Sequence, residues 1–503
     1  MHLWGETLTF GSAFFLLLAL GLALGFEFIN GFHDTANAVA TVIYTKSLKP
    51  VPAVIWSGVW NLIGVMTSTG AVAFGILALL PVDLVTHVGS WPGFAMVFAI
   101  LLSAIVWNLG TWWFGLPASS SHTMIGSIIG VGLAYSAFPG MSNGLHFGEG
   151  VNWAKAQEVG MVLIISPLFG FCAAGLLLLL SKAIIKIPAL YAAPKEGEKP
   201  PLGIRALLVL TCTGVSFAHG SNDGQKGMGL LMLILIGLVP GAFALKAGTS
   251  PQTVAALAAQ AQMNVVALHE KVGDAAATMT DDEAEAELGG LLKGKVKKSD
   301  KTYAALSFES ATIATALEGK TTFDTFATEE RRTLRTRIYL VDEVTGKLDK
   351  GKKLDDLSPE AQKALTGFKK QGDAVTKYIP DWVKIAVALA LGLGTMIGWK
   401  RIVVTVGEKI GKAHLTYGQG AAAELVAWST IGLASNYGLP VSTTHVLSSG
   451  IAGTMAANGS GVQGKTLRNI LLAWVLTLPV CIFLGATLFS GVLYVLFHFV
   501  GVK

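Results

Sequence analysis

Charged side chains are scarce in this chain of 503 residues. Asp, Glu, Lys and Arg make up 14% of it, whereas soluble globular proteins average about 25%. The deficit is concentrated in apolar stretches that are long enough to cross a bilayer. They cover residues 12–32, 51–80, 162–180, 204–220, 227–245, 385–399 and 470–500. This excludes an ordinary soluble protein and predicts an all-α polytopic membrane protein with about 10–12 membrane segments.

Cysteine is also scarce, and familiar catalytic motifs are missing. The three cysteines lie in apolar stretches without metal-ligand spacing, so we expect no fixed structural metal and no cofactor. The chain has no G-x-S-x-G elbow and no phosphate-binding loop of the Walker type. Ser121 and His122 are adjacent, which places them about 100° apart on a helix and makes them a poor nucleophile–base pair. We therefore predict that the protein is not an enzyme, and the small net charge of +5 predicts no nucleic-acid partner.

One segment differs from the rest. Residues 246–378 contain 20 of the 37 basic and 20 of the 32 acidic residues, so we expect a soluble, largely helical insertion with no net charge. The predicted domains are a first membrane repeat (1–181), a basic cytoplasmic linker (182–205), the start of a second repeat (206–245), the insertion (246–378) and the remainder of the second repeat (379–503). Because short basic loops favour the cytoplasm, 46–49, 182–205 and 400–412 predict that the insertion lies on the outer face.

Two sequence motifs occur twice. The chain reads LPASSSH at 116–122 and LPVSTTH at 439–445, and it reads GFHD at 31–34 and GSND at 220–223. From Asp34 to His122 is 88 residues, and from Asp223 to His445 is 222 residues. The excess of 134 matches the insertion, so without it the two halves have the same internal spacing. Such duplication predicts an inverted repeat of two homologous halves with broken or re-entrant helices, as in many secondary transporters.

The hydroxyl motifs predict an anion site. Pro followed by Ser and Thr is typical of a helix start, and unpaired amides at such a start favour a phosphate-like anion. The candidate substrate-binding residues are Ser119, Ser120, Ser121, Thr123, Ser442, Thr443 and Thr444, followed by the motif histidines His122 and His445. The alternative is that these hydroxyls only pack helices or bond to their own carbonyls.

The acidic motifs predict a cation site. Carboxylates in apolar segments are costly and mark ion or proton pathways by default, while Gly31, Gly220 and Gly224 permit a local helix break that would free carbonyls. The candidate cation-coupling residues are Glu27, His33, Asp34, Asn37, Asn222, Asp223 and Gln225. Glu27 is equally compatible with a neutral structural role, and His33 with a satisfied polar side chain. Because no arginine lies near either hydroxyl motif, the anion would depend on helix starts and bound cations, which is the arrangement of a symporter.

The duplicated motifs resemble the signatures of the inorganic phosphate transporter (PiT) family. The similarity also covers WNLGTWWFGLPASSSHTMIG and GLASNYGLPVSTTHVLSSG, and it is greatest for the low-affinity members of Gram-negative bacteria, which also carry a polar insertion. The resemblance implies phosphate symport, with the proton as coupling ion in that bacterial branch and a neutral divalent metal–phosphate complex as one form of the substrate. Sodium-coupled members usually have Asn where this chain has His33.

Together these features predict a secondary active transporter that imports inorganic phosphate by cation symport, with protons favoured over sodium. A sodium-coupled phosphate symporter and a permease for sulfate or another oxyanion are the alternatives, since a few relatives of the PiT family carry sulfate. The expected partners are phosphate, the coupling cation, a co-transported divalent metal and the lipid bilayer. We expect a multi-pass protein of the bacterial inner membrane, with a homodimer as an open possibility.

Overall fold

The computed structural model describes the whole chain except residues 1, 35, 81–89, 139–145, 196–197 and 501–503, and it describes residues 36, 37 and 500 by their backbone alone. A short hairpin, β1 (His2–Leu3) and β2 (Glu6–Thr7), precedes the first helix. The α-helices before the insertion are α1 (Phe10–Asp34), α2 (Ala36–Tyr44), α3 (Pro50–Thr67), α4 (Ala71–Leu77), α6 (Trp91–Trp113), α7 (Ser120–Ser136), α8 (Trp153–Ile184), α9 (Leu202–Leu238) and α10 (Pro240–Phe243).

The remaining helices divide into two groups. The insertion contains α11 (Pro251–Val272), α12 (Asp281–Lys293), α13 (Asp300–Leu317), α14 (Thr328–Lys350) and α15 (Pro359–Thr376). It is followed by α16 (Asp381–Met396), α17 (Lys400–Glu408), α18 (Tyr417–Asn436), α19 (Thr443–Ala457) and α20 (Gly464–Val495). Short helical turns lie at Pro188–Tyr191 (η1), Gly273–Ala276 (η2), Phe323–Thr325 (η3) and Leu496–Val500 (η4).

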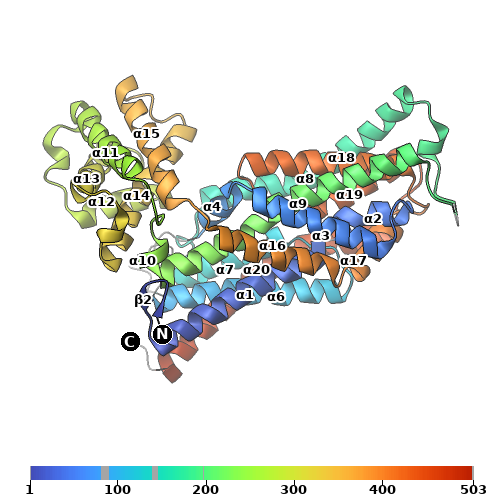
Figure 1. The fold of residues 1–503 in the computed structure, drawn as a ribbon, viewed down its shortest axis with the longest axis horizontal. Helices are drawn as coiled ribbons and strands as arrows, with labels where there is room; N and C mark the ends of the chain where they lie inside the picture. Colours follow the sequence, from blue (N-terminus) through green and yellow to red (C-terminus); the bar gives the residue numbers. More distant parts are fainter. Residues whose placement is uncertain (1, 35, 81–89, 139–145, 196–197, 501–503) are drawn as a thin grey trace.

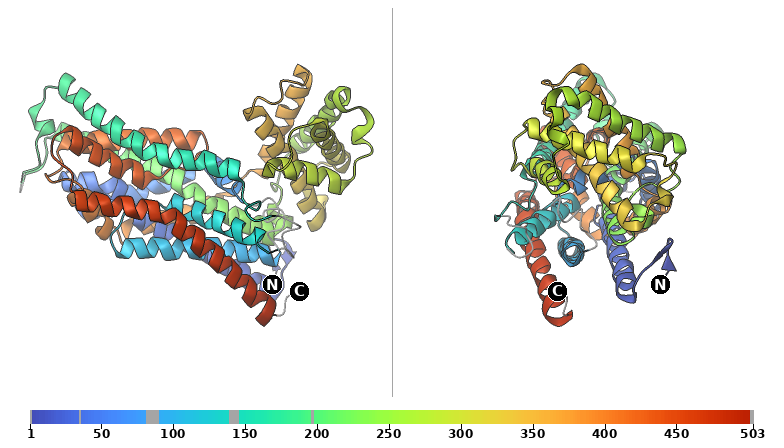
Figure 2. Two further views of the ribbon diagram at one scale, coloured as in Figure 1. Left: turned by 180° about the vertical axis from the view of Figure 1, so that it is seen from behind. Right: turned by 90° about the vertical axis from the view of Figure 1, so that its left-hand side faces the viewer.

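The long helices run side by side along the longest axis of the molecule (Figure 1). The insertion occupies one end of this bundle, and the β1–β2 hairpin and the end of α20 lie at the same end (Figures 1 and 2). The opposite end carries α2, α17 and the connection between α8 and α9 (Figure 1). These are the segments that contain or adjoin the three basic loops, so the basic loops and the insertion lie at opposite ends.

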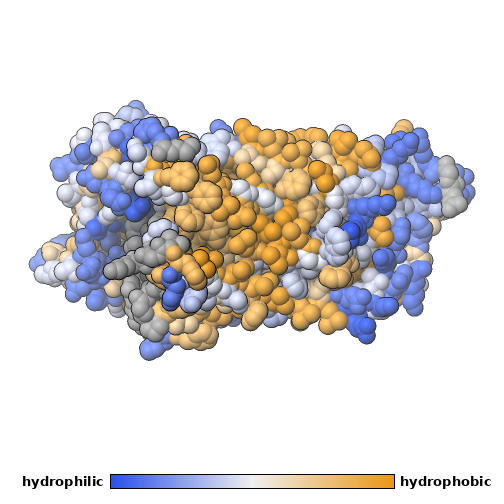
Figure 3. Space-filling view, turned by 90° about the horizontal axis from the view of Figure 1, so that it is seen from below, coloured by the Kyte–Doolittle hydropathy of each residue, from blue (hydrophilic) through white to orange (hydrophobic). Residues whose placement is uncertain are grey.

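An apolar belt surrounds the bundle between two hydrophilic ends (Figure 3). Within the described residues, six helices are long and apolar enough to span a membrane, and a seventh qualifies if the bent pair α15–α16 is counted as one span. This is fewer than the predicted 10–12 segments. The difference arises because α4, α7, α16 and α19 have fewer than 18 residues, so each can cross only part of a bilayer that requires about 20. The chain is a multi-pass membrane protein.

Glycines allow the helices to approach closely. A Cβ atom on Gly220 of α9 would lie 2.1 Å from the Asn61 carbonyl oxygen of α3, and one on Gly31 of α1 would lie 2.3 Å from the Leu391 carbonyl oxygen of α16. The predicted break at the second acidic motif is wrong, because α9 continues without interruption through Gly220 and Gly224. There glycine permits backbone contact between helices and does not interrupt the helix.

The insertion has a hydrophobic core of its own. Buried leucines, valines and aromatic residues of α11–α15 pack together separately from the core of the bundle. At its base the Lys246 amide donates to the Val375 carbonyl over 2.9 Å, and the Tyr378 hydroxyl donates to the Phe243 carbonyl over 3.1 Å. These bonds close the two strands of chain that connect the insertion to α10 and α16.

Candidate functional site

Both hydroxyl motifs form helix starts, as the sequence predicts. Ser119 is the N-cap of α7, where its hydroxyl accepts from the His122 amide at 3.3 Å. Ser442 is the N-cap of α19, where its hydroxyl accepts from the His445 amide at 3.2 Å. An N-cap oxygen satisfies one of the orphan amides of the first turn and leaves the others available. The two capping serines therefore shape the helix starts, and the residues after them present hydroxyls to the interior.

Asp34, at the end of α1, receives hydroxyls from both helix starts. Ser120 of α7 donates to Asp34 Oδ2 at 2.9 Å and also to Asn30 Oδ1 at 2.6 Å. Thr444 of α19 donates to Asp34 Oδ1. Asp34 is 2% exposed, so these hydrogen bonds replace the water that a carboxylate requires. One carboxylate thus joins the two motifs, which lie 323 residues apart in the chain.

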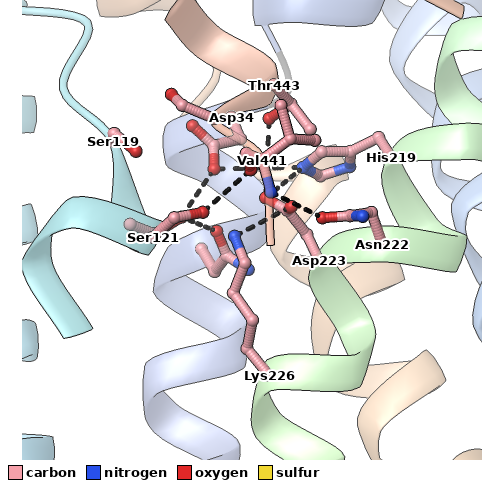
Figure 4. Close-up of polar contacts among 12 residues, drawn as sticks. Asp34, Ser119, Ser121, His219, Asn222, Asp223, Lys226, Val441 and Thr443 are labelled. Carbon is pink, nitrogen blue, oxygen red and sulfur yellow. Dashed lines mark hydrogen bonds and ion pairs between the residues drawn. The ribbon is translucent and has the colours of Figure 1, made fainter. Parts of the chain in front are cut away.

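Asp223, in the middle of α9, has a fixed counter-ion. Lys226 Nζ lies 2.8 Å from Asp223 Oδ1, and both side chains are buried. The other oxygen of Asp223 accepts from Thr443 of α19 at 3.5 Å and lies 3.3 Å from His219 Nε2 (Figure 4). Asp223, Lys226 and His219 occupy one face of α9 because they are four and three residues apart. The ammonium group of Lys226 balances the charge of Asp223 inside the protein.

His219 connects the two carboxylates. Its Nε2 lies 3.9 Å from Asp34 Oδ2 and 3.3 Å from Asp223 Oδ2, and its Nδ1 bonds to Asn61 Oδ1 at 2.9 Å. One ligand atom from each of Asp34, His219 and Asp223 lies within 4.8 Å of the others. These three side chains form the acidic cluster. Two carboxylates and an imidazole at this spacing can hold a proton or a small cation.

Three other predicted residues lie near this cluster. His33 bonds to Thr111 of α6 at 3.1 Å and approaches Asp34 at 3.4 Å. Glu27 is fully buried and accepts from Asn30 Nδ2 at 3.4 Å. Ser121 donates to the Val441 carbonyl at 2.9 Å, which binds the start of α7 to the turn before α19 (Figure 4). These residues support the site from its edges.

The remaining predicted residues point elsewhere. Thr123 donates to Asn108 of α6 at 3.0 Å and to its own helix. Gln225 accepts from the Val72 amide of α4 at 2.9 Å. Asn222 donates to Ser435 and to the Leu439 carbonyl, which holds the turn before α19. The side chain of Asn37 lies outside the described residues.

The two motif histidines stack on each other. Their ring centroids are 4.5 Å apart, and His445 also stacks on Trp474 at 3.9 Å. Both imidazoles are buried. Since neither is part of the acidic cluster, their observed role is to pack the first turns of α7 and α19 together.

Sequence reasoning missed Lys226, His219 and Asn30 as members of the site. Their spacing gave a signal, because His219 and Lys226 lie four residues before and three residues after Asp223. Lys226 also occupies the position in the second motif that Asn37 has in the first. The expectation that no fixed positive charge supports the site considered arginine alone, and the buried lysine corrects it.

Comparisons with known proteins agree with this site. The model of the family described as "Phosphate transporter family" matches residues 30–485. The chain belongs to the phosphate transporter family. It is 43% identical to the low-affinity inorganic phosphate transporter PitA of Escherichia coli (strain K12) over 493 residues, 95% of this chain and 96% of the relative. It is 41% identical to PitB of the same organism over 488 residues, 94% of this chain and 96% of the relative.

A solved structure also matches the fold. "The sodium-dependent phosphate transporter" aligns with a TM-score of 0.51 and 17% sequence identity, and the alignment covers 96% of this chain and 99% of the other. At this identity the match concerns the fold alone. The family membership establishes that this membrane protein transports inorganic phosphate, and its homologues are transporters and not enzymes.

Proposed function

We propose that this phosphate transporter imports its substrate by cation symport, with the acidic cluster as the coupling site. The observation that carries the proposal is the position of Asp34, which accepts hydroxyls from the starts of both α7 and α19. A cation bound at Asp34 therefore contacts the same hydroxyl groups as an anion bound between the two helix starts. Binding of one ion changes the surroundings of the other, which is the basis of coupling.

Phosphate binding in this proposal takes place at the first turns of α7 and α19. Their free amides, together with the hydroxyls of Ser120, Thr443 and Thr444, are suitable donors to a tetrahedral anion. These hydroxyls now donate to Asp34 and Asp223. A proton or cation that neutralises Asp34 weakens those bonds and frees the hydroxyls for phosphate.

Electrostatics also favours coupling. With a neutral His219, Asp34 and Asp223 together carry one more negative charge than Lys226 balances. Two like charges about 4 Å apart repel by roughly 4 kcal/mol at an effective dielectric constant near 20. One bound cation cancels this excess before phosphate arrives. The fixed ammonium of Lys226 lowers the number of mobile cations that the site needs.

The proton is our preferred coupling ion, since His33 and His219 both lie within 4 Å of Asp34 and imidazoles bind and release protons near neutral pH. The oxygen atoms around Asp34 would also suit sodium, so a sodium-coupled symporter is the alternative. A sulfate or other oxyanion permease would use the same helix starts. The substrate of our proposal is phosphate, free or as a divalent metal complex.

The inverted repeat that we propose is supported by equivalent contacts in the two halves. A Cβ atom on Gly64 would lie 2.2 Å from the Phe217 carbonyl oxygen, and one on Gly394 would lie 2.0 Å from the Phe28 carbonyl oxygen. Phe28 and Phe217 are 189 residues apart, the same separation as Asp34 and Asp223. Likewise α7 packs on α20, and α19 packs on α8. Each contact has its counterpart with the roles of the halves exchanged.

We further propose that the basic end faces the cytoplasm and that the soluble insertion is periplasmic, in an inner membrane. The chain then begins and ends outside, and α9 carries it outward to the insertion. A single cysteine in place of Asp300, in a variant without the native cysteines, should react with an impermeant maleimide once only the outer membrane is open. Labelling that requires an open inner membrane would reverse the orientation. Homodimer formation is a separate proposal that size measurement in detergent would test.

The decisive experiment is radiolabelled phosphate uptake into proteoliposomes with proton and sodium gradients imposed separately. We expect accumulation driven by an inward proton gradient without sodium, and its loss with an uncoupler. A strict need for sodium would select the sodium-coupled alternative. Sulfate in excess should leave uptake unchanged, and its competition at equal concentration would favour an oxyanion permease. Downhill flux that no cation gradient can concentrate would reject symport.

A further inference from the structure

A pocket that the transport site does not use lies at the basic end of the molecule. It has a volume of about 600 Å³ and is formed where α6 ends and α17 begins. Its walls contain Trp112, Trp113 and Phe114 on one side and Lys400 and Arg401 on the other. Trp113 and Phe114 are 61% and 76% exposed. Large aromatic side chains this exposed indicate a surface that water does not normally cover.

Several bonds hold these walls together. The Arg401 guanidinium lies 4.5 Å from the ring centroid of Trp113 and 4.9 Å from that of Trp112, and it donates to the Trp113 carbonyl at 2.7 Å. The Trp112 indole donates to the Gly398 carbonyl at 2.8 Å, and the Thr405 hydroxyl donates to the Gly115 carbonyl at 2.8 Å. The pocket is therefore a fixed feature that joins the two halves of the chain.

All the charged side chains that line this pocket are positive. They are Lys400, Arg401 and Lys409. In the part of the chain that the structure describes, Lys400 and Lys409 form no ion pair and no acidic residue lines the pocket. The neighbouring Glu408 is instead bonded to Tyr44. An anionic group would pair with the three uncompensated charges.

The position of the pocket identifies the kind of anion. The candidate membrane span α6 ends at Trp113, so the pocket lies where the apolar belt meets the hydrophilic end. Below it, α6 exposes Val106 and Leu109, and α16 exposes Leu393 and Ile397. A ligand here meets positive charge and aromatic rings at its head and aliphatic side chains along its tail. Tryptophan and lysine at this level are typical of a contact with lipid headgroups.

We propose that this pocket binds the headgroup of an anionic phospholipid, whose acyl chains lie along the exposed apolar residues of α6 and α16. The lipid phosphate pairs with Lys400 and Lys409, while Arg401 remains on the two tryptophans. Because α17 and the end of α6 belong to opposite halves of the chain, the lipid bridges the two halves at the basic end.

Native mass spectrometry of the detergent-purified protein tests this site. Palmitoyl-oleoyl-phosphatidylglycerol and the matching phosphatidylcholine are added at equal concentration to wild type, to Lys400→Gln/Lys409→Gln and to Lys49→Gln/Lys199→Gln. The last variant removes two exposed lysines from the same end but outside the pocket. We expect phosphatidylglycerol binding to fall at least about 10-fold in the pocket variant only, since each lysine near an anionic headgroup contributes roughly fivefold.

Further arms separate the remaining explanations. Lys400→Arg/Lys409→Arg should retain phosphatidylglycerol binding, and Trp113→Ala should weaken it without changing the charge. Phosphatidylcholine binding should be the same in all variants. Equal loss in the control lysine variant would mean that the lipid responds only to the charge of that end. Displacement of phosphatidylglycerol by inorganic phosphate would identify a free-anion site, and either result would overturn the proposal.

Discussion

The two acidic motifs occupy equivalent places in the sequence but are neutralised in different ways. Asp34 is surrounded by hydroxyls and histidines that can change partners or protonation state. Asp223 is paired with the ammonium of Lys226 at 2.8 Å. The difference teaches that duplication of the backbone does not duplicate the electrostatics. We infer that Asp34 responds to a mobile cation, whereas Asp223 shares its charge with a fixed one.

The largest effect is expected from Asp223→Asn, which leaves Lys226 buried without its carboxylate. Breaking a buried ion pair from one side costs about 3–5 kcal/mol, so folded protein in the membrane and its Tm should both fall. Asp223→Asn/Lys226→Met removes both charges and should restore most of the Tm. If the double variant is no more stable than the single one, the ion pair does not account for the burial of Lys226.

Asp34→Asn should have a smaller effect on stability but should remove uptake. The amide still accepts from Ser120 and Thr444 but carries no charge, so we expect transport to fall by about 100-fold, which corresponds to about 2.7 kcal/mol. Abundance in the membrane should remain near wild type. Gradient-driven phosphate uptake into proteoliposomes measures this change, and normal accumulation with the usual cation dependence would contradict the role of Asp34.

Ser120→Ala and Thr123→Ala compare two hydroxyls three residues apart on α7. Ser120 donates to Asp34, whereas Thr123 faces Asn108 and its own helix. A hydrogen bond to a charged group contributes about 1.5–3 kcal/mol, so Ser120→Ala should lower uptake by roughly 10-fold or more. Thr123→Ala should remain within about threefold of wild type. Equal losses would show that the helix start, and not the individual hydroxyl, determines phosphate binding.

The smallest effect concerns a third buried carboxylate, Asp342 of the insertion, which has neither the hydroxyls of Asp34 nor the close ammonium of Asp223. Neither of its oxygens has a hydrogen-bond partner among the described residues. Burial, together with the nearby Asp373, raises the pKa of Asp342 well above its ordinary value, against smaller opposing effects of Lys377 and Lys369. The folded insertion therefore favours the protonated form and loses stability as the pH rises from about 4 towards that raised pKa.

Asp342→Asn should stabilise α14 and α15 by about 1–3 kcal/mol at neutral pH, with little change near pH 4. Hydrogen exchange of these two helices in the full-length protein at both pH values measures the difference. Asp355→Asn, an exposed acid in the same insertion, provides the control. A gain that is the same at both pH values would exclude titration of Asp342 as its cause.

The sequence determined the class of protein and the location of the site. Long apolar stretches require a membrane, and Pro followed by hydroxyl residues requires a helix start wherever it occurs, so the starts at Ser120 and Thr443 were predictable. The repeated motifs carried the family and its substrate. These inferences depend on local physics and on motif order, which a single chain displays directly.

Only the tertiary structure decided which side chains meet. Periodicity places His219, Asp223 and Lys226 on one face of a helix, but it does not say that Asp34 of another helix lies 3.9 Å from His219. Nor does it tell whether a glycine breaks a helix or admits a neighbour, as Gly220 does with Asn61. Hydroxyls next to one another, such as Ser120 and Ser121, differ by about 100° in direction and so reach different partners. The reason is that ion pairing and close packing depend on contacts between helices that are hundreds of residues apart in the chain.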